Sequence, residues 1–218
     1  MSLTDLLQKG GPVMLALLLL SVATLTIVLL KTWDFWEQRL SARDFVQRAL
    51  DAWQRGQTDQ ALSILGARAT PLAALMAAAI AARARNEVPE EKQREQLARL
   101  AAEKLESVRA LLRPLEVIAS LAPLLGLLGT VLGMIKVFQR MQEAGERISP
   151  AILSGGLWEA LLTTAGGLAV AIIALAAFHT FDRQVERLRH DMEGALTGIF
   201  TQPLNGARPA AREAAHVH

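Results

Sequence analysis

One carboxylate, Glu159, stands alone in the longest apolar stretch of the chain. It is the only residue charged at neutral pH between Arg147 and Asp182. A charged carboxylate at the centre of a bilayer costs roughly 2.5–3.5 kcal/mol on insertion scales, so such residues face a bundle interior or water, where they carry ions or protons. We therefore predict that Glu159 is a proton site within a membrane helix.

Two hydroxyl residues follow Glu159 on the same predicted helix. Thr163 is one turn further along, on the face that Gly166 continues, whereas Thr164 lies about 140° away on an ideal helix. Hydroxyls beside an intramembrane carboxylate can hold water or pass protons, and the alternative is that each bonds only a backbone carbonyl. A purely structural glutamate would need a cationic partner, and we expect none within any of the three spans.

A second apolar run carries a stripe of small residues. Pro123, Gly126, Gly129, Thr130 and Gly133 fall within about a third of the circumference of an ideal helix. Lipid provides no hydrophobic drive for helix association, so small residues that let helices approach closely mark a protein-facing side. Thr130 on this stripe is either a hydroxyl that lines a pore or a part of the close packing.

The apolar runs predict an all-α integral membrane protein with three transmembrane helices. Of the 218 residues, 52% are apolar, and the mean hydropathy is +0.28. Residues 10–30 and 117–135 are uncharged, and the third run surrounds Glu159; each reaches the roughly 20 residues that a helix needs to cross hydrocarbon. The first run is longer than a typical signal peptide and lacks a small-residue cleavage site before Lys31, so we expect it to remain as a membrane helix.

The distribution of positive charge predicts the orientation. Residues 31–113 hold 14 of the 23 Lys and Arg residues, against one before the first span and three between the second and the third. Positive segments remain in the cytoplasm, so we expect the amino terminus and the loop at 139–149 to lie outside, and residues 31–115 and the carboxyl terminus to lie in the cytoplasm. The same segment holds 11 acidic residues, which leaves no basic face for nucleic acid. The absence of cysteine excludes disulfides and thiolate metal sites, and we predict no metal.

Helical patterns continue outside the spans. Ser41 and Thr58 are predicted helix caps, Gly56 and Gly66 are predicted helix ends, and Pro71 is expected to open a further helix. The uncharged stretch 69–82 is too short for a fourth span and suits a buried helix.

Long helical extensions are predicted for the second and third spans. From Pro89 an apolar seam leads directly into the second span, with bends expected at Pro114 and Pro123, and the third span continues into an amphipathic helix. The seams consist of Leu97, Ala101, Leu105, Val108, Leu112 and Leu115, and of Val185, Leu188, Met192, Ala195 and Ile199. We expect the two extensions to pack together below the membrane.

These patterns predict an order of segments along the chain. They are a periplasmic amino terminus at 1–9, a first transmembrane helix at 10–30, a cytoplasmic helical segment at 31–115, a second transmembrane helix at 116–138, a periplasmic loop at 139–149, a third transmembrane helix at 150–181, a cytoplasmic helix at 182–202 and a disordered tail at 203–218.

The residues of the second and third spans resemble the signature helices of the MotA/TolQ/ExbB proton-channel family. The resemblance is carried by Ala122-Pro-Leu-Leu-Gly-Leu-Leu-Gly-Thr-Val-Leu-Gly-Met134 and Trp158-Glu-Ala-Leu-Leu-Thr-Thr-Ala-Gly-Gly-Leu168. It implies a homopentamer whose second and third helices line a pore that holds the transmembrane helices of an ExbD/TolR-type dimer. It also implies a proton pathway through Glu159, Thr164 and Thr130. Thr163 takes the place of the usual alanine of the family, which leaves open which of the two neighbouring threonines lines the path.

The glycines of the two helices are assigned to helix packing: Gly126, Gly129, Gly133, Gly166 and Gly167. No cofactor is expected beyond the coupling ion, which we take to be the proton, although these residues leave sodium open. The chain contains no nucleotide-binding motif that would provide another energy source. The resemblance implies a motor subunit of the bacterial inner membrane that the ion gradient drives and that passes work to a TonB/TolA-type protein.

Three spans disfavour the four-span flagellar type of this family, and overall similarity favours the ExbB type over the TolQ type of the Tol-Pal envelope system. A passive membrane scaffold is the second reading of the sequence. An intramembrane enzyme is the third and least supported reading, because the spans contain no paired carboxylate, Ser/His dyad or metal cluster.

Overall fold

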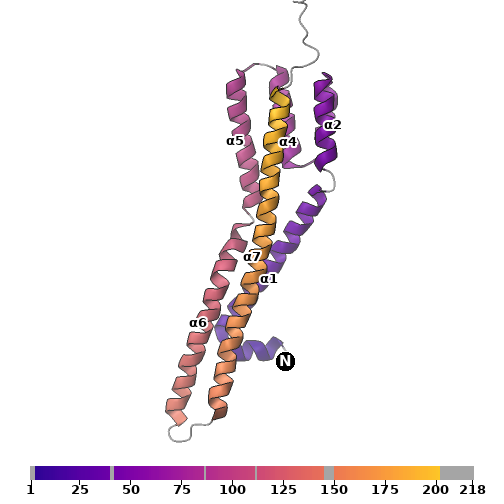
Figure 1. Ribbon diagram of the computed structural model, residues 1–218. Helices are drawn as coiled ribbons and strands as arrows, with labels where there is room; N and C mark the ends of the chain where they lie inside the picture. Colours follow the sequence, from indigo (N-terminus) through magenta and orange to yellow (C-terminus); the bar gives the residue numbers. More distant parts are fainter. Residues whose placement is uncertain (1–2, 40–41, 86, 111, 145–149, 202–218) are drawn as a thin grey trace, which may run out of the picture. The chain divides into compact units, whose positions relative to one another are not determined.

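The chain consists of helices throughout the part that the structure describes. The structure is a computed structural model that describes residues 3–39, 42–85, 87–110, 112–144 and 150–201 (Figure 1). These residues form seven helices in two compact units. The membrane unit comprises Met1–Trp33 and Ala110–Asp182, and the bundle unit comprises Asp34–Arg109 and Arg183–His218. The predicted tail at 203–218 and the predicted Ser41 cap lie outside the described residues.

Three long apolar helices supply the membrane unit: α1 (Leu3–Arg39), α6 (Arg113–Ala144) and α7 (Pro150–Thr201). Their segments Gly11–Trp33, Arg113–Glu143 and Ser154–Thr201 are long and apolar enough to cross a membrane. The last of these is far longer than the roughly 20 residues that a bilayer requires. Charged residues return from Asp182 onward, which ends the apolar part of α7.

The first helix changes direction near its start. Gly11 has a φ of 59°, a left-handed conformation that glycine adopts without steric cost, and Pro12 follows it. Beyond this kink α1 packs on the other two helices. The shared apolar cluster consists of Val13, Leu17, Ile118, Ala122, Val170, Ala171 and Ala174.

The bundle unit is built from α2 (Ala42–Gln54), α3 (Thr58–Gly66), α4 (Pro71–Arg85), α5 (Glu90–Arg109) and the end of α7. Its core contains the fully buried Trp53, Leu75, Met76 and Ile80. Helix α4 is apolar on all sides over residues 71–82 and contributes six buried residues to the core, as the length of its uncharged stretch predicts. Leu97 of α5 joins Met192, Ala195 and Ile199 of α7 in the same core, which confirms that the two predicted extensions pack together.

Helix α5 does not lead directly into the second span, contrary to the expectation from its seam. Helix α5 ends at Arg109, and α6 begins at Arg113. Pro114 therefore occupies the first turn of α6, where its missing N–H group costs no hydrogen bond. Leu112 and Leu115 are both buried, so the apolar period continues across the break. Hydrophobic spacing alone therefore did not reveal the break between α5 and α6.

One predicted helix end has a simple local cause, and one predicted helix cap is wrong. Gly56, with a φ of 76°, ends α2 through bonds from its own N–H to the Trp53 carbonyl and from the Gln57 N–H to the Ala52 carbonyl. Gln57, and not Thr58, is the N-cap residue of α3, and its side chain makes no capping bond. Thr70 caps the α4 helix that Pro71 opens, accepting a 3.2 Å hydrogen bond from the Ala73 N–H.

Candidate functional site

Helices α6 and α7 approach each other along a seam of small residues. An added Cβ at Gly129 would stand 2.5 Å from the Thr163 Oγ1, and one at Gly133 would stand 2.9 Å from the Ala160 Cβ. One at Gly167 would stand 2.5 Å from the Ala122 carbonyl oxygen, a backbone atom that cannot move aside alone. The seam pairs the two helices in antiparallel register, and only residues without large side chains fit at these positions.

The predicted packing glycines divide between two contacts. Gly126, Gly129, Gly133 and Gly167 lie in the α6–α7 seam, whereas an added Cβ at Gly166 would meet Leu17 and Met14 of α1 at 3.9 and 4.0 Å. The seam also contains residues that the sequence analysis did not single out. Gly156 contacts Val137, and Ala160 contacts Gly133. The spacing of small residues at 156, 160, 163 and 167, in steps of four, three and four, is the signal that could have identified them.

Glu159 lies at the edge of this seam and is half-buried. Its neighbour Ala160 is buried in the seam, while Trp158 on the other side is 61% exposed. Seven residues, or about two turns, separate Glu159 from Gly166, so both lie on the side of α7 that faces α1. No described residue forms a hydrogen bond or ion pair with the Glu159 carboxylate, which leaves it available to water or to another protein chain.

A cation stands at nearly the same level of the seam. Because Gly133 meets Ala160 and Val137 meets Gly156, Lys136 on α6 lies within about one turn of Glu159 along the seam. The Lys136 Nζ lies beside the kink, 3.4 Å from the position of an added Cβ at Gly11. Lys136 follows directly after the uncharged run 117–135 but lies inside the predicted second span at 116–138, so the expectation that the spans hold no cation is wrong.

The three predicted pathway threonines occupy different environments. Thr163 is buried in the seam, and its hydroxyl donates a 2.7 Å bond to the Ala160 carbonyl of its own helix. Thr164 donates a 3.0 Å bond across the seam to the Gly126 carbonyl of α6. Thr130 is partly exposed and donates a 2.7 Å bond to the Leu127 carbonyl. Every one of these hydroxyl protons is therefore committed to a backbone oxygen, although each hydroxyl oxygen can still accept a bond.

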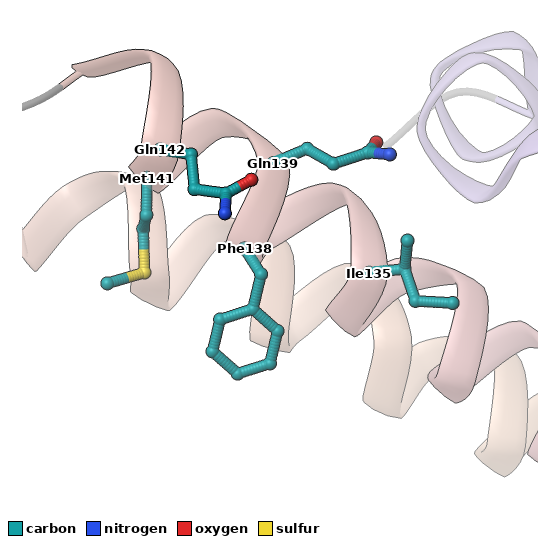
Figure 2. A pocket seen from close by; sticks show the side chains of 5 residues that line it. All are labelled: Ile135, Phe138, Gln139, Met141 and Gln142. Atoms are coloured by element: carbon teal, nitrogen blue, oxygen red, sulfur yellow. The ribbon is translucent and has the colours of Figure 1, made fainter.

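A hollow lies on the surface of α6. Its lining side chains all come from the last part of that helix and are Ile135, Phe138, Gln139, Met141 and Gln142 (Figure 2). The lining is mixed, with two amides beside apolar side chains, and no titratable group is among these residues. The side chains that line the hollow therefore offer no acid–base chemistry of their own.

Comparison with known families identifies the same region. The family model described as the MotA/TolQ/ExbB proton channel family matches residues 67–194, more than half of the chain. The match includes both helices of the seam, Glu159 and the three threonines.

A named relative is similar over a shorter region. The chain is 37% identical over 68 residues to a protein named biopolymer transport protein exbB1 of Vibrio cholerae serotype O1 (strain ATCC 39315 / El Tor Inaba N16961). The similar region covers 29% of this chain and 30% of that protein, so under a third of either sequence is compared.

Proposed function

Because this chain belongs to the MotA/TolQ/ExbB proton channel family, we propose that it is the proton-channel subunit of an inner-membrane motor that powers TonB-dependent transport across the outer membrane. Such a motor converts the proton motive force into mechanical work. Each proton that crosses 100 mV releases about 2.3 kcal/mol. The similarity to a protein named biopolymer transport protein exbB1 supports an ExbB-type role, and a TolQ-type subunit of the Tol-Pal envelope system is the alternative.

The observation that carries the proposal is the placement of Glu159. A lone carboxylate lies half-buried at the edge of a glycine seam between two apolar helices, without a partner among the described residues. An acidic side chain without a partner inside a membrane costs free energy. The presence of Glu159 is explained if its role is to bind and release protons. Thr130 at the partly exposed flank of α6 is our candidate for a further hydroxyl on the water path.

The exposed surface of the membrane helices supports assembly into a ring. Large apolar side chains on α6 and α7 remain uncovered in the single chain: Leu124, Leu127, Leu128, Val131, Trp158 and Leu161. Lipid or neighbouring protein must cover such a surface. We propose that five copies enclose a pore formed by α6 and α7, that a dimer of single-span ExbD/TolR-type subunits fills it, and that a TonB/TolA-type protein receives the work.

Replacing Glu159 tests the proposed function. Glu159→Gln preserves size and hydrogen bonding but cannot ionise, so expression and assembly should remain normal while gradient-driven uptake of TonB-dependent ligands is abolished. Glu143→Gln is the matched control, because Glu143 is an exposed carboxylate at the end of α6. Uptake by the control should match wild type, and replacing sodium with choline in the medium should change nothing.

Normal uptake by Glu159→Gln cells would refute the proton role, and the passive scaffold would take its place. Co-purification from native membranes tests the assembly separately. The expected result is an oligomer that retains a small single-span partner with an acidic residue in its helix. A monomer without a partner in mild detergent would rule out the pore, because three helices cannot enclose another.

A further inference from the structure

The hydroxyl of Thr164 joins α6 to α7 at a point where their backbones approach closely. Its 3.0 Å bond to the Gly126 carbonyl connects residues 38 apart in the sequence. The hydroxyls of Thr163 and Thr180, also on α7, donate instead to carbonyls of α7 itself, those of Ala160 and Ala176. Thr164 therefore differs from these two threonines by linking one membrane helix to another.

The surrounding contacts explain why this bond is possible. An added Cβ at Gly126 would lie 3.1 Å from the Thr164 Cα, and one at Gly167 would lie 3.0 Å from the Gly126 Cα. Glycine at 126 and 167 thus brings the two backbones near enough for a short side chain to reach across. Any larger residue at these positions would separate the helices and lengthen the bond.

The position of Thr164 on its helix separates it from the carboxylate. Thr164 is five residues after Glu159, which places the two about 140° apart around α7. Its hydroxyl proton already points to the Gly126 carbonyl. The arrangement is suited to holding α7 in place and poorly suited to passing a proton directly to Glu159.

We propose that Thr164 is a positioning residue, whose hydroxyl pins α7 against α6 at Gly126 and thereby sets the place of Glu159 beside the seam. The bond itself is independent of what the protein does, while its contribution to ion coupling rests on the proposed function. Thr164 would then support proton transfer through the geometry of the helix pair and not as a relay.

The test compares three variants in the complex purified from native membranes. Thr164→Val keeps the shape but removes the hydroxyl, Thr164→Ser keeps the hydroxyl, and Thr180→Val is the control on the same helix. Two quantities are measured: amide hydrogen exchange over residues 126–130, and proton uptake by proteoliposomes. Thr164→Val should raise exchange roughly threefold or more, the size expected for loss of an interhelical bond in a membrane, and should lower proton uptake. Thr164→Ser should restore both quantities, and Thr180→Val should change neither.

Each other outcome overturns the proposal. Lower uptake with unchanged exchange would make Thr164 a proton relay, and raised exchange with unchanged uptake would make its bond structural only. If Thr164→Val does not assemble, Thr164→Ala removes the same hydroxyl and is judged by the same two measurements. Glu159→Gln is measured in parallel. Retained uptake in that variant would refute the proposed function, whereas the exchange data would still decide whether the bond exists.

Discussion

Gly129 and Gly155 are a matched pair for measuring the cost of filling the seam. An added methyl at Gly129 would overlap the Thr163 side chain, whereas no atom stands within 4 Å of one at Gly155. We expect Gly129→Ala to destabilise the protein by about 1–3 kcal/mol, as overpacking does. Gly155→Ala should be neutral or slightly stabilising, because alanine favours helix. Thermal unfolding of the two purified variants in the same detergent measures the difference, and equal stability would contradict the close contact.

The crowding at Gly129 predicts a partial rescue by its neighbour. Thr163→Ala removes the Oγ1 and Cγ2 atoms that would stand 2.5 and 3.2 Å from the new methyl, but its Cβ remains at 2.7 Å. The single Thr163→Ala variant should be well tolerated, since the lost bond goes only to the Ala160 carbonyl of the same helix. Combined with Gly129→Ala, it should recover part of the lost stability. Strictly additive effects in a double-mutant cycle would argue against a direct contact.

At the scale of elements, the end of α7 is held by a charged cluster of the bundle unit. The guanidinium groups of Arg83 and Arg94 lie 5.1 and 4.9 Å from the centre of the Phe200 ring, and both pair with Glu90. Arg83 also donates a 3.4 Å bond to the Phe200 carbonyl. A cation at a helix carboxyl terminus opposes the partial negative charge of the exposed carbonyls. The cluster thus connects α4 and α5 to the last turn of α7.

Removing Glu90 should loosen this end of α7. In Glu90→Gln the two arginines lose their shared partner, so amide exchange over residues 195–201 should rise. Glu91→Gln, at the exposed neighbouring position, is the control and should leave exchange unchanged. Exchange that is equally slow in both variants would show that the apolar core alone holds the helix end.

The same cluster predicts a response to acid. Hydrogen bonds from Arg83 and Arg94 lower the pKa of Glu90 below its ordinary value. A carboxylate with a lowered folded-state pKa contributes stability above its unfolded-state pKa and loses that contribution as the pH falls through the folded-state value. The difference in exchange between wild type and Glu90→Gln should therefore be full at neutral pH and shrink in strongly acidic buffer. A difference that did not change with pH would contradict this origin.

For the whole molecule, the orientation in the membrane is a prediction that labelling can test. The absence of cysteine allows single-cysteine variants. By the predicted topology, Gln8 and Ala144 are periplasmic positions for such a cysteine, and Gln93 is a cytoplasmic one. Gln93 is buried, with its amide bonded to the Val88 carbonyl, so its protection would say nothing of topology. Exposed Gln96 and Gln142 are better positions. On intact cells an impermeant reagent should label cysteine at Gln142 and not at Gln96, and a permeant reagent should label both. The reverse pattern would invert the topology.

Several features follow from the sequence because they depend on local chemistry. Long apolar runs predict membrane helices, since an unpaired backbone in lipid is too costly for any other local form. Glycine at Gly56 predicts a helix end, and a lone Glu159 in an apolar helix predicts an ionisable site. Family resemblance is equally a property of the sequence, and the family match confirms it.

Other features were decided only by the tertiary structure, because they depend on which residues meet. The 3.6-residue period places Thr163 and Gly166 on one face of α7 and Thr164 on another, but it does not show which residue meets which helix. Packing places Thr163 inside the seam, bonds Thr164 to Gly126 of α6 and turns Gly166 toward α1. It also brings Lys136 to the level of Glu159 from a position 23 residues earlier in the chain. The spacing of residues in one sequence shows which residues share a face of a helix. How closely two helices approach depends on the side chains of both helices together.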